Sequence, residues 1–249
     1  MVLRETGNMR RMYDAAYPPY LPPKWEIVAG YIGGNTPHIW TDDEWKLQIR
    51  LAEAIWILPI WACSFPANHD PLAHAKQVLA WLEERAAPLG ICVGLDFETA
   101  VDSTYVRTFD KHLTYYGYKT LLYGSASSIY HNPEPSGGYW VADWTGVAHL
   151  LPGTSATQWS GSKPFGGAYD PSLVADSTTL WKVGNMSLSK EDLLAIKGLI
   201  RDEVLRATMF LAGRSNARYS VSIEELQDAK TIDDVLARLD EMSPPGSLP

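Results

Sequence analysis

Two acidic side chains stand two positions apart at the end of an apolar run. The run 91–95 leads directly into Asp96 and, two residues later, Glu98. Because side chains alternate across a β-strand, both carboxyl groups are expected on one face, about 7 Å apart along the chain. Such a pair can supply a proton donor and a second group that stabilises or activates the attacking partner, as glycoside hydrolysis requires. Acidic residues also end strands simply by entering solvent, and the motif alone leaves that interpretation open.

The composition excludes several classes of partner. A net charge of -8 argues against nucleic acid or an anionic membrane, since both require a basic surface. No apolar run in the sequence approaches the length of a membrane span. A hydrophobic fraction of 46%, with 10 Trp and 13 Tyr, indicates a folded protein with a sizeable core. The aromatic residues suit either that core or a sugar-binding site.

The potential metal ligands are few and scattered. Cys63 and Cys92 both lie in apolar, strand-like runs, where a small buried side chain is the expected role. We therefore expect neither a disulfide nor a zinc site. His69 and His74 are separated by five positions rather than the four that would place two ligands on one helix face. The sequence predicts no cofactor and no metal ion.

The N-terminal residues 1–7 lack the apolar core of a secretory signal. The expectation is a soluble chain made in the cytoplasm without a signal peptide. If such a protein acts on a cell wall, it must do so after release or as part of a virion.

Strands and helices are predicted to alternate over the first half of the chain. Strands are expected over 11–14, 25–32, 55–61, 90–98 and 119–123, and helices over 41–53, 70–87 and 103–116. Two helix starts carry capping signals, namely Thr41 with Glu44, and Asp70 before Pro71. This alternation predicts βα units around a parallel sheet.

The pattern changes after residue 123. Short strands are expected over 139–144, 156–159 and 168–170, with little room for long helices between them. The predicted fold class is therefore α/β, a barrel over 1–185 that begins with βα units and closes with nearly bare strands. Apolar residues then recur at helical spacing over 193–205, which predicts a separate helical segment over 186–249. Residues 187–212 are expected to form a homo-oligomer or to dock into a larger assembly, with packing on the barrel as the alternative.

Seven short motifs follow one another along residues 10–182. They are Tyr13-Asp14, GYIGG at 30–34, LDFE at 95–98, LYGS at 122–125, YWVADW at 139–144, TQW at 157–159 and Tyr169-Asp170. Their order resembles that of the glycoside-hydrolase-like domains related to the family 25 lysozymes, found in actinobacterial proteins and phage lysins. The resemblance implies an irregular TIM-like (β/α)5(β)3 barrel. It also implies a peptidoglycan-degrading glycosidase whose partner is bacterial cell-wall glycan, as a phage lysin or a virion-associated hydrolase.

The resemblance assigns four carboxylates to the site. Glu98 would be the general acid, and Asp96 would orient or stabilise the reacting N-acetyl group or a water. Asp14 and Asp170 would shape the electrostatic field. Clustered carboxylates cannot all ionise cheaply, so a raised pKa is predicted for Glu98. The lysozymes open with Gly-x-Asp, and here Met12 stands in place of that glycine.

Two alternatives remain open beside the carboxylate assignment. A chitinase-like site also carries Asp-x-Glu on a barrel strand, but Cys92 and Gly94 occupy its two upstream acidic positions. Strand spacing does not distinguish retention from inversion, which depend on carboxyl separations of about 5–5.5 Å and about 6.5–9.5 Å respectively.

The residues expected to bind substrate lie near the carboxyl ends of predicted strands, where barrel enzymes place their sites. They are Tyr31, Trp61, Tyr123, Trp140, Gln158 and Trp159. Core packing is the alternative for each aromatic residue, and a satisfied core amide is the alternative for Gln158. The competing function for the whole chain is a non-catalytic module that binds cell wall or forms part of a phage tail.

Overall fold

A computed structural model describes residues 9–19, 22–63, 70–97 and 102–183. Internal contacts divide the chain into a unit of Met1–Met186 and a unit of Ser187–Pro249. The helical C-terminal segment predicted from the sequence, including the assembly role of 187–212, lies outside the described residues. The elements of the first unit are β1 (Met9–Ala15), β2 (Ile27–Gly34), α1 (Asp42–Leu51), β3 (Trp56–Ala62), α2 (Pro71–Glu84), β4 (Cys92–Asp96), α3 (Ser103–Tyr115), β5 (Lys119–Ser125), α4 (Ala126–Ile129), β6 (Tyr139–Ala142), β7 (Ala156–Gln158), the 3₁₀ helix η1 (Lys163–Phe165), β8 (Asp170–Ala175) and β9 (Trp181–Lys182).

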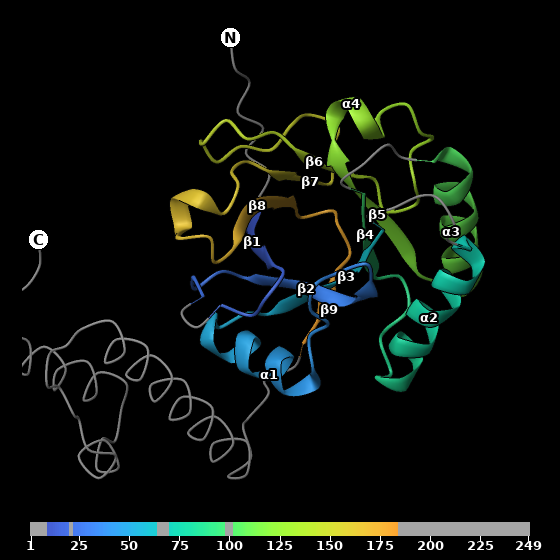
Figure 1. Cartoon of the computed structure of the whole chain (residues 1–249), viewed down its shortest axis with the longest axis horizontal. Coiled ribbons are helices and arrows are strands. Elements are labelled where there is room, and N and C mark those ends of the chain that lie inside the picture. Colours follow the sequence, from blue (N-terminus) through green and yellow to red (C-terminus); the bar gives the residue numbers. More distant parts are fainter. Residues whose placement is uncertain (1–8, 20–21, 64–69, 98–101, 184–249) are drawn as a thin grey trace, which may run out of the picture. The chain divides into compact units, whose positions relative to one another are not determined.

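Strands β1 to β8 close into a barrel (Figure 1). Every neighbouring pair from β1–β2 round to β6–β7 is parallel. Strand β8 runs antiparallel to both of its neighbours, β7 and β1. The short β9 pairs with the start of β3. The predicted α/β class and TIM-like barrel are confirmed.

Helices α1, α2 and α3 connect β2 through β5 and cover that part of the barrel, whereas β6 to β8 carry no long helix (Figure 1). The capping signals act as predicted. Thr41 and Glu44 form a reciprocal capping box at the start of α1. The Asp70 side chain accepts the Leu72 N–H at the start of α2. The nearly bare second half expected from the sequence is also observed.

The last barrel strand differs from its prediction. A strand was expected over 168–170, but β8 begins at Asp170 and continues to Ala175. It is held by pairing to β1 and β7, two strands that its local sequence does not reveal. Because β8 is reversed, its first residue lies at the same end of the barrel as the last residues of the parallel strands. Asp170 is thereby brought to the end where barrel enzymes place their sites.

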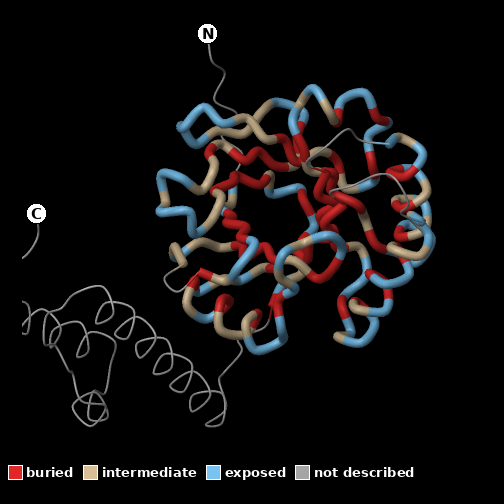
Figure 2. Tube along the Cα trace, viewed as in Figure 1, coloured by how far each residue is buried: buried red, intermediate tan, exposed pale blue. Residues whose placement is uncertain are grey.

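The strands bury apolar side chains on both faces, and Figure 2 shows burial concentrated along the barrel with exposed residues in the outer loops. The inner face contributes a cluster that includes Met12, Ala29, Ile60, Leu121 and Val174. The outer face packs against the helices: Val28 and Leu95 of the strands share a cluster with Leu82 of α2 and Phe109 of α3. The barrel interior is therefore a packed core rather than a channel.

Both cysteines are buried and free, as expected from their apolar surroundings. Burial raises the pKa of the Cys92 thiol to about 11. Burial is also the main cause of a raised pKa at Cys63. Both side chains therefore stay as neutral thiols at physiological pH. Within the described residues, each helix is too short or too polar to cross a lipid bilayer.

Candidate functional site

The inner face of the barrel changes from apolar to polar at one end. Asp14 follows Met12 by two positions, so it faces inwards like Met12. On the other strands, residues an even number of positions from an apolar inner residue also face inwards. At this end of the barrel they are polar, namely Tyr31, Asp96, Tyr123, Gln158 and Asp170. These residues lie towards the carboxyl ends of parallel strands, or at the start of the reversed β8. Three of the four predicted carboxylates thus share one end of the barrel.

Asp14 and Asp170 form a cross-strand pair between β1 and β8. Their Cα atoms are register partners, so both side chains point to the same side of the sheet. Asp14 is 6% exposed and Asp170 is half-buried. The pair therefore places two carboxyl groups side by side at the polar end of the barrel.

Tyr31 is hydrogen-bonded to Asp96 within the polar end of the barrel. Its phenolic O–H donates to Asp96 Oδ2 at 2.9 Å, across the intervening strand β3. Burial, followed by the negative charges of Asp96 and Asp14, raises the pKa of Tyr31 well above its ordinary value. The phenol stays protonated at physiological pH and remains a donor. Asp96 is only 3% exposed, so this hydrogen bond fixes the orientation of a buried carboxyl group.

The raised pKa of Tyr31 predicts a loss of stability in alkali. Above about pH 10 the unfolded chain releases the phenolic proton while the folded chain retains it, so the stability due to Tyr31 falls as pH rises. Tyr31→Phe should therefore give a shallower decline in the free energy of unfolding between about pH 9 and about pH 11. Urea titrations followed by circular dichroism measure this slope. Tyr115→Phe is the control, since Tyr115 is 82% exposed. An unchanged slope for Tyr31→Phe would contradict the argument.

Gln158 is a shared acceptor on β7. Its Oε1 accepts the Tyr123 O–H at 2.6 Å and the Trp144 Nε1–H at 2.7 Å. Gln158 is 1% exposed, whereas Trp144 is 66% exposed. Trp144 is not among the residues predicted to bind substrate. It lies in the loop two positions after β6 ends at Ala142, so alternation along the strand does not predict its direction.

Trp140 is buried beside Tyr123. The two residues are register partners on β6 and β5, and their ring centroids lie 4.6 Å apart. Trp140 is 1% exposed, and its Nε1–H donates to Ser172 Oγ at 3.0 Å. Its indole therefore packs in the core against Tyr123, and this burial does not support its predicted contact with substrate.

Trp61 and Trp159 face away from the barrel interior. Trp61 is 4% exposed, belongs to the outer cluster and packs beside His74 of α2, with ring centroids 5.2 Å apart. Trp159 has the parity opposite to that of Gln158 and packs against Phe165 of η1. The prediction considered only their proximity to strand ends and ignored parity. This placement does not support their predicted contact with substrate.

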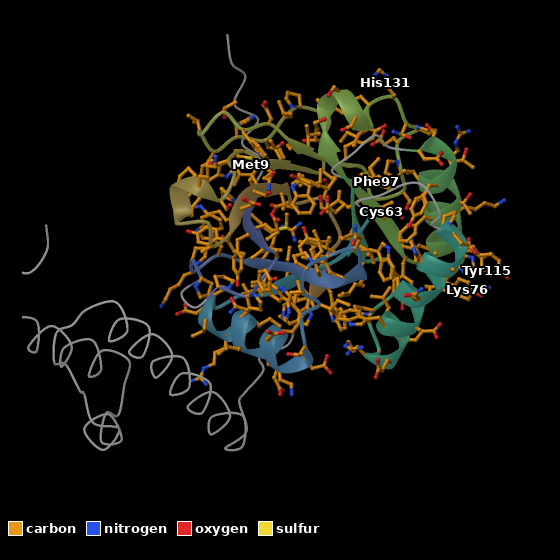
Figure 3. All side chains as sticks on the ribbon, in the orientation of Figure 1. Met9, Cys63, Lys76, Phe97, Tyr115 and His131 are labelled. Carbon is orange, nitrogen blue, oxygen red and sulfur yellow. The ribbon has the colours of Figure 1, made fainter. Side chains whose placement is uncertain are left out.

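The predicted proton donor, Glu98, lies outside the described residues. The preceding Phe97 packs in the outer cluster, so the alternation that turns Phe97 outwards is consistent with the inward position of Asp96. Cys63 and Phe97, labelled in Figure 3, mark where the chain leaves β3 and β4. Across the residues that the structure describes, no group of three or more His, Cys, Asp or Glu side chains is placed to hold a metal ion.

No protein-family model matches the chain, and no curated protein matches it. Several solved structures share its fold. The catalytic domain of an endolysin from bacteriophage P40 of Listeria monocytogenes superposes with a TM-score of 0.51 at 14% identity, over 68% of this chain and 94% of that one. A Tat-secreted protein of Mycobacterium tuberculosis, solved with HEPES, gives 0.50 at 11% identity, over 69% and 98%. An uncharacterized B. stearothermophilus protein gives 0.50 at 15% identity, over 67% and 96%.

These likenesses concern the fold. Each spans about two thirds of this chain and nearly the whole of the other one. Identities of 11–15% transfer no residue roles. The chemistry must therefore be argued from the polar end of the barrel itself.

Proposed function

We propose that the chain is a lysozyme-like glycoside hydrolase that cleaves the glycan strands of bacterial peptidoglycan, as a phage lysin or a virion-associated wall hydrolase. The observation that carries the proposal is the convergence of Asp14, Asp96 and Asp170 on the inner face at one end of the barrel. A barrel of the same fold forms the catalytic domain of a phage endolysin. The motif order along 10–182 adds support.

The charge distribution suits glycoside hydrolysis. The transition state of this reaction resembles an oxocarbenium ion and carries positive charge on the sugar ring. Carboxylates held in a partly buried layer stabilise such a charge more strongly than they would in water. The proposed role of Asp14 and Asp170 is to supply this negative field.

Asp96 and Glu98 are proposed to have different roles. Asp96 accepts the Tyr31 O–H, which favours its carboxylate form and fixes its orientation. An ionised Asp96 can hold the N-acetyl group of the substrate or the attacking water. Nearby negative charges favour the protonated form of a further acid, so Glu98, two positions on, is the proposed donor of a proton to the departing glycosidic oxygen.

Clearing of purified cell walls tests the proposed activity. The full chain should clear a peptidoglycan zymogram, and Glu98→Gln, which keeps the shape of the side chain but cannot donate the proton, should not. Actinobacterial walls are the first substrate because the resembling domains occur in actinobacterial proteins and phage lysins. Equal clearing by both proteins would reject Glu98 as the general acid.

The competing proposal is a module that binds the wall without cutting it. It predicts that the chain sediments with purified peptidoglycan while no new reducing ends appear. Binding of that kind by the unmodified chain, over a range of pH, would replace the hydrolase proposal.

A further inference from the structure

The loop between β6 and β7 presents an indole ring to solvent at the polar end of the barrel. Trp144 is 66% exposed, yet its only polar atom donates to the buried Gln158 Oε1 at 2.7 Å. The indole is therefore anchored by its N–H and leaves apolar ring surface uncovered. Large aromatic side chains that are fixed but exposed are characteristic of binding surfaces.

An ion pair links two residues of the same loop, one on either side of Trp144 in the sequence. His149 Nε2 lies 2.8 Å from Asp143 Oδ2, and the Asp143 N–H donates to the Gln158 carbonyl of β7 at 2.9 Å. The Gly146 N–H donates to the Trp159 carbonyl, also at 2.9 Å. Trp144 immediately follows Asp143, so this pairing fixes the backbone from which the indole projects.

Both ring nitrogens of His149 have partners within the loop. Nδ1 lies 2.8 Å from the Val147 carbonyl oxygen and 3.2 Å from Thr145 Oγ1. Nε2 lies against the carboxylate of Asp143. The imidazole is therefore held on two sides by the loop that carries Trp144.

We propose that Trp144 is a carbohydrate-stacking residue whose position is maintained by the Asp143–His149 ion pair. The ligand class is a pyranose chain, which offers the apolar C–H face of a sugar ring to the exposed indole. Trp144 contacts the substrate, and His149 is a positioning residue that acts through the loop. This inference rests on the proposed glycan hydrolase function and deepens it by adding a binding residue.

Calorimetric titration with a soluble N-acetylglucosamine tetramer tests the inference. The full chain carrying Glu98→Gln serves as the background, so that binding is measured without hydrolysis. Adding Trp144→Ala should weaken Kd about tenfold, because loss of a well-placed aromatic contact commonly costs this much. Adding Trp144→Phe should cost less, since a ring remains. Tyr115→Ala is the matched control: Tyr115 is 82% exposed at the end of α3, and Figure 3 places it on the outer side of the domain.

A double-substitution comparison separates positioning from a merely structural role. In the Glu98→Gln background, adding His149→Gln should weaken Kd severalfold, but it should change Kd little when Trp144→Ala is also present, because His149 acts through the indole. An unchanged Kd for Trp144→Ala would overturn this inference and leave the proposed function standing. Failure of the chain to bind the tetramer, when the unmodified chain cleaves walls, would have the same meaning. An unchanged Kd for His149→Gln, or an equal loss with and without Trp144, would overturn the role of the ion pair. If the chain neither binds the tetramer nor releases reducing ends, the proposed function fails and the inference fails with it.

Discussion

Asp96→Asn is expected to slow the release of reducing ends from purified peptidoglycan by at least about a hundredfold, the usual effect of removing a charged group that stabilises a transition state. Asn has nearly the same shape, and it can still accept the Tyr31 O–H. The loss would therefore reflect the missing negative charge rather than a changed barrel. Initial rates at saturating wall concentration give the comparison.

Tyr31→Phe refines this expectation. It removes the hydrogen bond of 2.9 Å to Asp96 Oδ2 but keeps the ring and the carboxylate. Activity should fall by about tenfold, less than in Asp96→Asn, because the carboxylate stays and only its hydrogen bond from Tyr31 is lost. An Asp96→Asn protein with normal activity and a normal circular dichroism spectrum would remove Asp96 from the mechanism.

Gly34→Ala is expected to destabilise the domain by about 3–5 kcal/mol, the largest effect on folding among the substitutions considered. Gly34 ends β2 with φ of 87°, a conformation that side chains rarely adopt. A Cβ atom there would lie 1.9 Å from the carbonyl oxygen of Ala62 on β3. That atom belongs to the backbone and pairs the two strands, so the clash cannot be relieved by a rotamer change.

Gly146→Ala is the matched control for Gly34→Ala. Gly146 also has a positive φ, 75°, but no atom lies within 4 Å of the Cβ that alanine would add. Gly146→Ala should lower the free energy of unfolding by about 1 kcal/mol, because only the positive φ disfavours alanine there. Urea unfolding of both proteins separates the two contributions. Equal destabilisation would show that the contact with Ala62 is relieved by movement of the strands.

Local patterns predicted much of the barrel. The capping residues Thr41 and Asp70 marked the starts of α1 and α2, because capping depends on residues a few positions apart. The inward direction of Asp96 follows from alternation along β4, which needs no knowledge of neighbouring strands. The change from βα units to bare strands was visible in the spacing between apolar runs.

Features that depend on distant pairing were not predictable in the same way. The reversal of β8, which sets Asp170 opposite Asp14, is determined by pairing with β1 and β7. The anchoring of Trp144 to Gln158 depends on how a loop folds back over the barrel. Trp61 illustrates a different failure, because its outward position follows from parity and could have been read from the sequence.

Chemical analysis of the products tests the central claim most directly. Purified peptidoglycan digested with the full chain should be reduced with borohydride and analysed by mass spectrometry, with Glu98→Gln as the parallel sample. The proposed function predicts soluble fragments that end in a newly reduced amino sugar, and their absence from the Glu98→Gln digest. Soluble fragments with intact glycan strands and cut peptides, or no soluble fragments from the unmodified chain, would contradict it.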